Sequence, residues 1–503
     1  MSPDLLADYP AAVADEAVEP GGRLRPAYAP LGPVLHRLGT AGLAEAAAAL
    51  EAERSRRGVS LSAWSDGRQH PQPFRQDPWP RVVPLAEWTL LAAGVEQRHR
   101  ALTAFLADAY RAAGRRRGDP DRDPDVVRAG VLPPWAVAHS PGRTPEAVGL
   151  AWPGQARAGI AAADVVRTSD GRWVVVRDEL RAPAGLGFAL AGRDVARAAV
   201  PGLCPAEDSG VVDPRAALPV LQAGLAAGAP PECAGPPTVA VLTAGQTDGA
   251  YAEHAILAEA LGVPLVRAGD VWPRADGGVE LAVRGERVPV DVLYRRFDDA
   301  ALGAYRTPIG QALDSVLAEA VRAGRLGLVN VPGNGVADDV TTFAFVPAMI
   351  RFYLGEDPLL DSVRTWLLAD PDQWAQVRDR LDELVVEPAE GYGGSGTVAG
   401  PTASATELAQ LYAEVAAAPH RFVAREAVDS TTVPTLVDGV LRPRHVDLRV
   451  FSVATPEPRV LPAPLTRVAA QAGSTETAAA QGGGTKDTWL LGELRPPGSP
   501  AGR

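Results

Sequence analysis

The hydrophobic residues of this chain follow two different periods. Between residues 84 and 113, Trp88, Leu91 and Val95 stand at the spacing of one helix face, which predicts a long amphipathic helix. The run RWVVVRDELRAPAG at 172–185 is instead typical of a strand that ends in a turn. Both secondary-structure types are therefore expected early in the chain.

Helices and strands alternate further along. Residues 238–268 are expected to form a strand, a glycine-containing loop, a helix and a second strand, which together make a βαβ unit. Ser404 and Glu407 fit a capping box, so a helix is expected to begin at this point and to run to residue 415. The other expected elements are a hairpin at 277–299 and a series of strands at 420–468. The expected fold class is therefore α/β, without an internal repeat.

Length and charge limit the classes of function. A chain of 503 residues is long enough for about two to four domains or for one enzyme with several lobes. The net charge of −12 argues against nucleic acid or an anionic membrane as a partner. No apolar run reaches the roughly 18–20 residues of a membrane span, and the acidic start lacks the features of a signal peptide, so we expect a cytoplasmic protein. The two cysteines, Cys204 and Cys233, are too few for a metal cluster.

The basic residues are almost all arginine. Of 49 lysines and arginines, Lys486 is the one lysine. The abundance of Ala, Arg, Gly and Pro indicates a coding bias, so most arginines need no functional explanation. Such a bias can turn a lysine into arginine, but it does not by itself produce glutamate or valine.

Six stretches, taken in order, resemble one protein family. They are PLAEWTLLAAGVEQRHRALTAFLADAY, TAGQTDGAYAEHAILA, VDVLYRRFDD, NGVADDVTTFAFVPAMIRFYLGEDPLL, PTLVDGVLRPRHVDLR and QGGGTKDTWLL. The chain resembles the circularly permuted ATP-grasp family, type 2, which is similar to the synthetase half of glutathionylspermidine synthase. The likeness covers about residues 60–491. It implies two α+β lobes that clamp ATP, with a Rossmann-like βαβ segment and a helical N-terminal part.

Residues 1–30 and 495–503 are rich in Pro, Gly and Ala without clear periodicity, so both ends are expected to fray. Together with the resemblance, this composition divides the chain into a flexible N-terminus at 1–30, a helical region at 31–150, the metal-strand part of the ATP-grasp core at 151–235, a βαβ domain at 236–330, nucleotide-clamp lobes at 331–491 and a flexible tail at 492–503.

The family's reaction defines the chemistry that the site would need. ATP phosphorylates a carboxylate, and an amine attacks the acyl phosphate to give an amide or peptide bond. The implied cofactors are ATP and Mg²⁺, and the implied partners are a small-molecule carboxylate and amine, or a peptide. Triphosphate charge must be matched by Lys, Arg or backbone N–H groups, and magnesium by carboxylate or amide oxygens.

Several residues depart from the family's pattern. Glu387 stands at the position of the lysine in the family's VVKP sequence. A second family lysine follows the sequence ADD, and this chain has Val340 at that position. In the strand that supplies metal ligands in the family, this chain reads RDELRAPAG where the family reads EDNLRTPSG. Arg177 therefore replaces a metal-binding Glu, and Glu179 replaces a metal-binding Asn. Asp164, in AADVVRTSDG, remains where the family supplies another metal ligand. The predicted metal ligands are therefore Asp164 and Glu179, which shares a strand face with Arg177.

Other parts of the nucleotide site are present. Gly391, Gly393, Gly394 and Gly396 form a loop that could close over phosphates, although hairpin tips have the same composition. Lys486 stands in QGGGTKDTW, as in the family, and is predicted to face the ligand, with a solvated loop as the alternative.

Arginines supply the remaining candidates. Arg181, Arg295, Arg296 and Arg449 are predicted as catalytic residues and Arg467 as a cofactor-binding residue, with a structural ion pair as the alternative for all of these except Arg181. A final set is expected from strand position: Arg444, Asp447 and Arg449 are expected to share one face of a strand, with His445 on the other.

Two functions remain open. The chain is either an active carboxylate–amine ligase or a pseudoenzyme that acts as a binding or regulatory partner, for example of a catalytic relative. A charge pair at about 4 Å is worth about 4 kcal/mol in a half-buried site. A micromolar nucleotide is held by only about 8 kcal/mol. An acid at position 387 facing a phosphate would thus cancel much of that binding, unless arginines lie around Glu387 and Glu179.

Overall fold

The fold was analysed in a computed structural model. It describes residues 5–492, with the exception of 7, 13, 66–67, 73, 115–121, 207–208, 390–395 and 479–481.

One large sheet organises the molecule. In the part of the chain that the structure describes, this sheet has nine strands. Its main path is β13 (Asp361–Ser362), β5 (Trp173–Glu179), β4 (Ile160–Arg167), β19 (Val440–Val453), β21 (Leu465–Val468), β22 (Gly484–Leu491) and β3 (Gln76–Pro84). Strands β18 (Thr432–Val437) and β20 (Arg459–Val460) also pair with β19. Segments from both halves of the sequence thus meet in one sheet.

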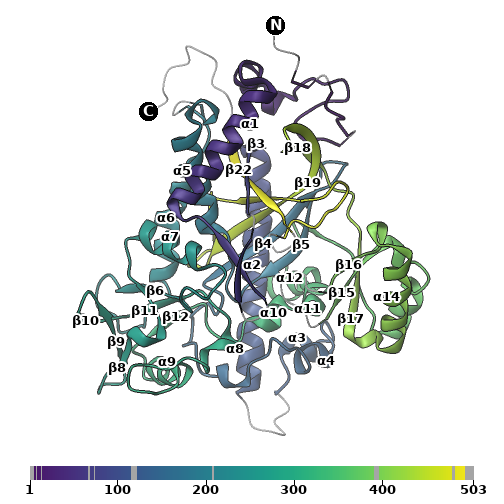
Figure 1. Cartoon of the computed structure of the whole chain (residues 1–503). Helices are drawn as coiled ribbons and strands as arrows, with labels where there is room; N and C mark the ends of the chain where they lie inside the picture. The colour runs from purple at the N-terminus through teal and green to yellow at the C-terminus, as the bar shows by residue number, and fades with distance from the viewer. Residues whose placement is uncertain are drawn as a thin grey trace.

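Helices cover both faces of this sheet. Helix α2 (Leu85–Ala113) packs Trp88, Leu91 and Val95 against Val165 and Leu448 of the sheet. The opposite face is covered by α1 (Gly32–Arg57), α5 (Leu186–Ala199) and α6 (Ala217–Ala226), and α7 (Tyr251–Leu261) packs on α5 (Figure 1). The predicted helix at 84–113 and strand at 172–185 are therefore confirmed.

A smaller parallel sheet forms a second unit. Its strand order is β12 (Gly327–Val329), β11 (Val292–Arg295), β6 (Val239–Leu242) and β7 (Leu265–Val266). Helix α7 joins β6 to β7, which confirms the predicted βαβ unit. The predicted hairpin at 277–299 is formed by β9 (Val279–Val283) and β10 (Glu286–Pro289), next to β8 (Val271–Pro273). The end of that range forms β11 of the parallel sheet instead.

A third unit, which we call the small lobe, stands apart at the right of Figure 1. It contains β14 (Thr365–Leu367), β17 (Phe422–Glu426), β15 (Leu384–Pro388) and β16 (Val398–Ala399), with α13 (Pro371–Val377) and α14 (Ala405–Ala417). Ser404 and Glu407 form the predicted capping box at the start of α14. The lobe has its own core, which includes Trp366, Leu384 and Leu411. The rest of the molecule is called the main body below.

The N-terminal segment differs from the expected frayed end. Asp15 and Glu16 are buried, and Glu16 forms a buried ion pair of 2.6 Å with Arg81 of β3. Thr431 also donates a hydrogen bond to Glu16. Composition suggested disorder, whereas these long-range polar contacts fix the segment.

Among the described residues, no helix combines the length and the apolar character that crossing a bilayer requires.

Candidate ligand cavity between the main body and the small lobe

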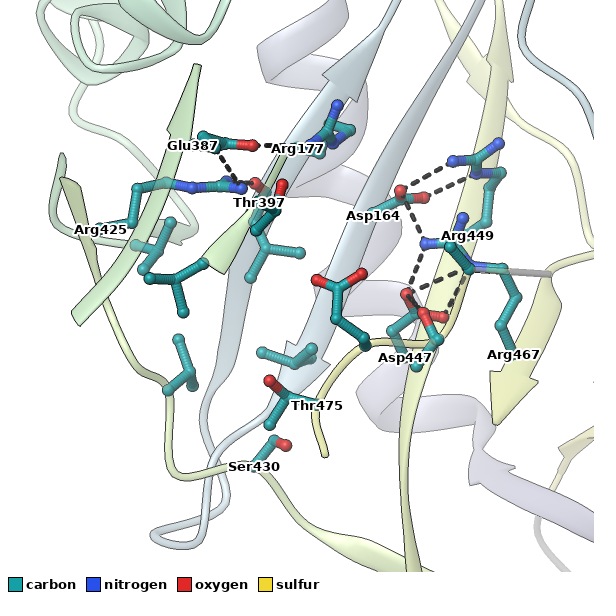
Figure 2. Close-up of a pocket in the computed structure, with 18 of the residues that line it drawn as sticks. Asp164, Arg177, Glu387, Thr397, Arg425, Ser430, Asp447, Arg449, Arg467 and Thr475 are labelled. Carbon is teal, nitrogen blue, oxygen red and sulfur yellow. Dashed lines mark hydrogen bonds and ion pairs between the residues drawn. The ribbon is translucent and has the colours of Figure 1, made fainter. Parts of the chain in front are cut away.

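A cavity of about 190 Å³ lies between the large sheet and the small lobe (Figure 2). Strands β4, β5, β19 and β21 form one wall, β15 and β17 form the other, and residues 475–478 close a third side. Its apolar lining consists of Val166, Val176, Val363, Val385, Val428 and Ala478. The remaining lining is polar or charged, so the cavity combines apolar walls with a dense set of ionisable groups.

On the main-body side, Asp164 is the centre of a guanidinium cluster. Arg449 donates to its two carboxylate oxygens at 2.7 and 2.8 Å, and Arg467 donates to one of them at 2.8 Å. Arg449 also reaches Glu179 at 2.6 Å, and Arg467 pairs with Asp447. Burial alone would raise the pKa of Asp164, but the two guanidiniums hold that pKa well below its usual range.

The strand register explains this cluster. In the β4–β19 pair, Asp164 lies opposite Arg449, and in the β19–β21 pair, Asp447 lies opposite Arg467. Residues directly opposite on neighbouring strands bring their side chains together on one face of the sheet. The sheet therefore places acid and arginine in alternating contact along the cavity wall.

On the opposite side, Glu387 of β15 lies between two arginines. Its carboxylate is 3.0 Å from Arg177 of β5 and 2.5 Å from Arg425 of β17. The Glu387 side chain is only 4% exposed, against 24% for Arg177. Arg425 also donates to the carbonyl of Val176. Arginines thus surround Glu387, the acid at the position where the pattern of the resembled family has a lysine.

Residues 475–478 add a further acid to the cavity. Burial raises the pKa of Glu476, while the nearby Arg177 opposes that shift. Thr477 donates a hydrogen bond of 2.6 Å to Asp447 and so holds this segment against the sheet.

A comparison with known families identifies the fold. The family model described as "Circularly permuted ATP-grasp type 2" matches residues 80–469, well over half of the chain. The chain belongs to the circularly permuted ATP-grasp type 2 family. Membership confirms the expected fold, and it implies the use of ATP and Mg²⁺.

The relatives match most of this chain, but the match covers different shares of their own length. A Frankia casuarinae protein named "Putative glutamate--cysteine ligase 2-2" is 42% identical, covering 97% of this chain and 55% of that protein. A Mycobacterium tuberculosis protein named as uncharacterized is 39% identical, covering 84% of this chain and 74% of its own length. This chain therefore spans about half the length of the Frankia relatives.

Among solved structures, the ATP-grasp chain resembles a glutathione synthetase-like effector from Globodera pallida in its apo form. The TM-score is 0.52 at 11% sequence identity, and the match covers 89% of this chain and 97% of that one. At this identity the likeness supports the fold alone.

The structure brings together part of the site predicted from the sequence. Asp164, Glu179, Glu387, Arg449 and Arg467 all line the cavity. Arg177 and Glu179 share the cavity face of β5, while Asp178 points away and pairs with Arg98, as strand periodicity predicted. These side chains lie together as expected, although what they bind stays a prediction.

The expectation for Arg444 is wrong. Positions 444 and 447 differ by an odd number, so they lie on opposite faces of β19, and Arg444 donates instead to the carbonyls of Ala470 and Pro443. His445, which was placed on the other face from Asp447, shares its parity and contacts Ser430 at 3.0 Å. Ser430 itself lines the cavity.

Lys486 lies outside the cavity lining. Its ammonium donates to Asp77 at 2.5 Å and to the carbonyls of Pro434 and Trp79, and the side chain is fully buried. Burial lowers the pKa of Lys486, which Asp77 opposes. In this conformation the three N–H donors of the ammonium are directed to protein acceptors.

The other predicted catalytic arginines lie near the parallel sheet. Arg295 pairs with Asp299 at 2.6 Å, and Arg296 pairs with Glu253 at 3.2 Å. Arg181 contacts Asp298 and Asp338, each at 2.9 Å. None of these three arginines lines the cavity described above. The arrangement of Arg295 and Arg296 matches the ion-pair alternative, and the catalytic roles of all three arginines remain predictions.

The glycine loop is mostly outside the described residues. This applies to Gly391, Gly393 and Gly394, whereas Gly396 is described and has a φ of +79°. At the position of the second lysine, Val340 is buried at the start of α11 (Val340–Phe343) and contacts Leu367 and Val423 of the small lobe.

Arg425, Glu476 and Thr477 are among the cavity residues that were missed from the sequence. Arg425 follows the apolar strand sequence FVA, so a strand could be predicted there, but not which strand it pairs with. Glu476 and Thr477 lie in a stretch of Ser, Thr and Ala that carries no periodic signal.

The described residues do not fit a magnesium site of the expected kind. Both oxygens of Asp164 already accept from guanidiniums, Glu179 accepts from Arg449, and position 177 supplies a cation. In the part of the chain that the structure describes, no three His, Cys, Asp or Glu side chains are grouped to hold a metal ion. Magnesium prefers several free oxygen ligands, so its binding here would require these ion pairs to break.

Proposed function

We propose that this chain is a binding or regulatory protein with an ATP-grasp ligase fold, in which internal ion pairs replace magnesium–nucleotide chemistry. The observation that carries this proposal is the contact of 3.0 Å between Arg177 and Glu387. In the family's pattern, the first position is an acid that holds metal and the second a lysine that holds phosphate. Here both charges are reversed, and the two side chains neutralise each other.

Electrostatic magnitudes support this proposal. A unit charge pair at about 4 Å is worth about 4 kcal/mol near a protein surface, so an acid in place of a lysine changes the energy of a facing phosphate by roughly twice that. Micromolar binding provides only about 8 kcal/mol in total. Arg177 and Arg425 offset the charge of Glu387, but the contacts that they make with it leave fewer of their donors for a ligand.

A binding or regulatory role requires a partner or a ligand. The names of the Frankia relatives refer to an amino-acid ligase. We therefore propose a catalytic relative of this family as the partner, with an amino-acid substrate or product as the alternative ligand of the cavity.

A second candidate is an active carboxylate–amine ligase. The name of the Frankia relatives, glutamate--cysteine ligase, favours this function and suggests glutamate and cysteine as substrates. It is also favoured by the number of guanidiniums at the cavity, since arginine is a good partner for phosphate groups.

ADP release separates the two candidates. The purified full chain is incubated with magnesium and ATP, alone and with glutamate and cysteine, and ADP is measured by a coupled assay. The binding-protein proposal predicts no release above the rate without protein, and no rise in melting temperature at millimolar nucleotide. Release that depends on both amino acids would overturn the proposal in favour of the ligase.

A further inference from the structure

Few apolar contacts join the small lobe to the main body. Its core, around Trp366 and Leu411, is separate from the cores of the main body. A cluster that spans the two units contains Val340, Leu367 and Val423, with a few partly buried neighbours. A lobe with its own core and a small apolar seam is a unit that can move as a rigid body.

Polar contacts across the cavity add to the few apolar contacts between the small lobe and the main body. Arg177 of the main body pairs with Glu387 of the lobe at 3.0 Å, and Arg425 of the lobe donates to the carbonyl of Val176 in the main body. Glu387 joins the two arginines, being 2.5 Å from Arg425. We call Arg177, Glu387 and Arg425 the latch. Figure 2 shows Glu387 joined by dashed lines to Arg177 and to Arg425.

We propose that the latch holds the two units closed in the absence of any ligand, with Arg177 and Glu387 as the residues that decide this. In a clamp that closes on a ligand, opposite walls carry charges that the ligand must bridge. Here the two walls carry charges of opposite sign that meet directly. The cavity is therefore closed by the protein itself, and its ligand specificity is set by the groups that remain beside the latch.

The burial of the latch makes it strong enough for this role. In the pair that joins the two units, the side chains of Arg177 and Glu387 are 24% and 4% exposed, so solvent screens their attraction only in part. Removing one member of such a buried set leaves the other charges without compensation, which is far more costly than losing an exposed pair. Opening the lobe separates Arg177 from Glu387 and therefore meets a barrier that a surface pair would not supply.

Small-angle scattering and amide hydrogen exchange of the full chain, without nucleotide, test the latch. The variants are Arg177→Met and the nearly isosteric Glu387→Gln, which preserves packing if the first fails to fold. We expect a larger radius of gyration in both, and exchange at residues 475–478 that is faster by about tenfold or more. In a double-mutant cycle the two changes should be strongly non-additive.

Asp178→Asn is the matched control. It breaks a buried pair with Arg98 on the same strand β5, but within the main body. It should lower the melting temperature without enlarging the molecule. Unchanged dimensions and exchange in both latch variants would overturn the proposal, as would a wild type that contracts when magnesium and ATP are added.

The inference rests on the proposed function only in taking nucleotide to be unnecessary for closure. The two can fail separately. ADP release by a wild type that is already compact would overturn the proposed function and support the latch. A wild type that is open and inactive would overturn the latch alone.

Discussion

Positions 486 and 387 make an instructive pair. The resemblance in sequence assigns a lysine to the family's pattern at both positions; this chain has Lys486 at the first and Glu387 at the second. The kept lysine lies outside the cavity, fully buried, with Asp77 and two carbonyls as acceptors. The changed position lies in the cavity wall, between Arg177 and Arg425.

The difference separates structural from ligand-related charge. Lys486 joins β22 to β3 and to the start of β18, so its retention is explained by the sheet. Glu387 has neighbours that compensate its charge, so its presence is explained by a change of partners within the cavity. A residue shared with a family is therefore weak evidence for ligand binding until its contacts are known.

Breaking the ion pair between Asp77 and Lys486 should lower the free energy of unfolding the most. Asp77→Ala leaves a buried ammonium facing only carbonyls, and we expect a loss of about 3–5 kcal/mol in the free energy of unfolding. Urea unfolding measures this. The double variant Asp77→Leu with Lys486→Met should recover much of the loss. A loss below about 1 kcal/mol for the single change would show that Lys486 has other partners in solution.

Placing a lysine at position 340 should also lower the stability of the fold. Val340→Lys places an ammonium in the seam with Leu367 and Val423, and we expect a loss of about 2–4 kcal/mol in unfolding free energy. Val340→Ile serves as the control for size, with an expected loss of less than about 1.5 kcal/mol. A gain of stability for Val340→Lys upon addition of magnesium and ATP would mean that the seam is a nucleotide site.

Replacing Asp164 should lower the free energy of unfolding by a smaller amount, and this loss should depend on pH. In Asp164→Asn, Arg449 still pairs with Glu179 and Arg467 with Asp447, so we expect a loss of about 1–3 kcal/mol at neutral pH. Because the folded-state pKa of Asp164 is depressed, its contribution is complete above the unfolded value of about 4. It is lost as the pH falls below that value.

Melting temperatures from pH 7 to pH 2 measure this contribution. The difference between wild type and Asp164→Asn should shrink in the acid range. A difference that stays constant with pH would contradict the ion-pair cluster.

Glu476 should show the smallest effect. Burial raises the pKa of Glu476, so its protonated form is favoured in the folded state, and any stability from it is lost as the pH rises through that pKa. Glu476→Gln should change the unfolding free energy by no more than about 0.5 kcal/mol. The wild type should be the less stable of the two at high pH in chemical unfolding. The reverse order would indicate that Glu476 is held as a carboxylate by the cavity arginines.

The sequence predicted the elements well because their signals are local. The period of Trp88, Leu91 and Val95 and the Ser404–Glu407 capping box both depend on residues within a few turns. The faces of β5 also followed from parity, which placed Arg177 and Glu179 together. The same rule, applied incorrectly, misplaced Arg444.

The site was less predictable because it depends on strand pairing over long distances. Asp164 meets Arg449 only because β4 pairs with β19, 285 residues further along the chain. Likewise, Arg425 reaches Glu387 through the β15–β17 pair, and nothing in the sequence near Arg425 indicates that pairing. Family resemblance indicated the positions that matter, but not the partners that those side chains have.

Isothermal titration of magnesium–ATP into the wild-type chain tests the central claim most directly. If Arg177 and Glu387 satisfy each other, no site remains for a metal-bound triphosphate. No saturable heat is then expected up to millimolar nucleotide. A binding isotherm with a micromolar dissociation constant, dependent on magnesium, would contradict the claim.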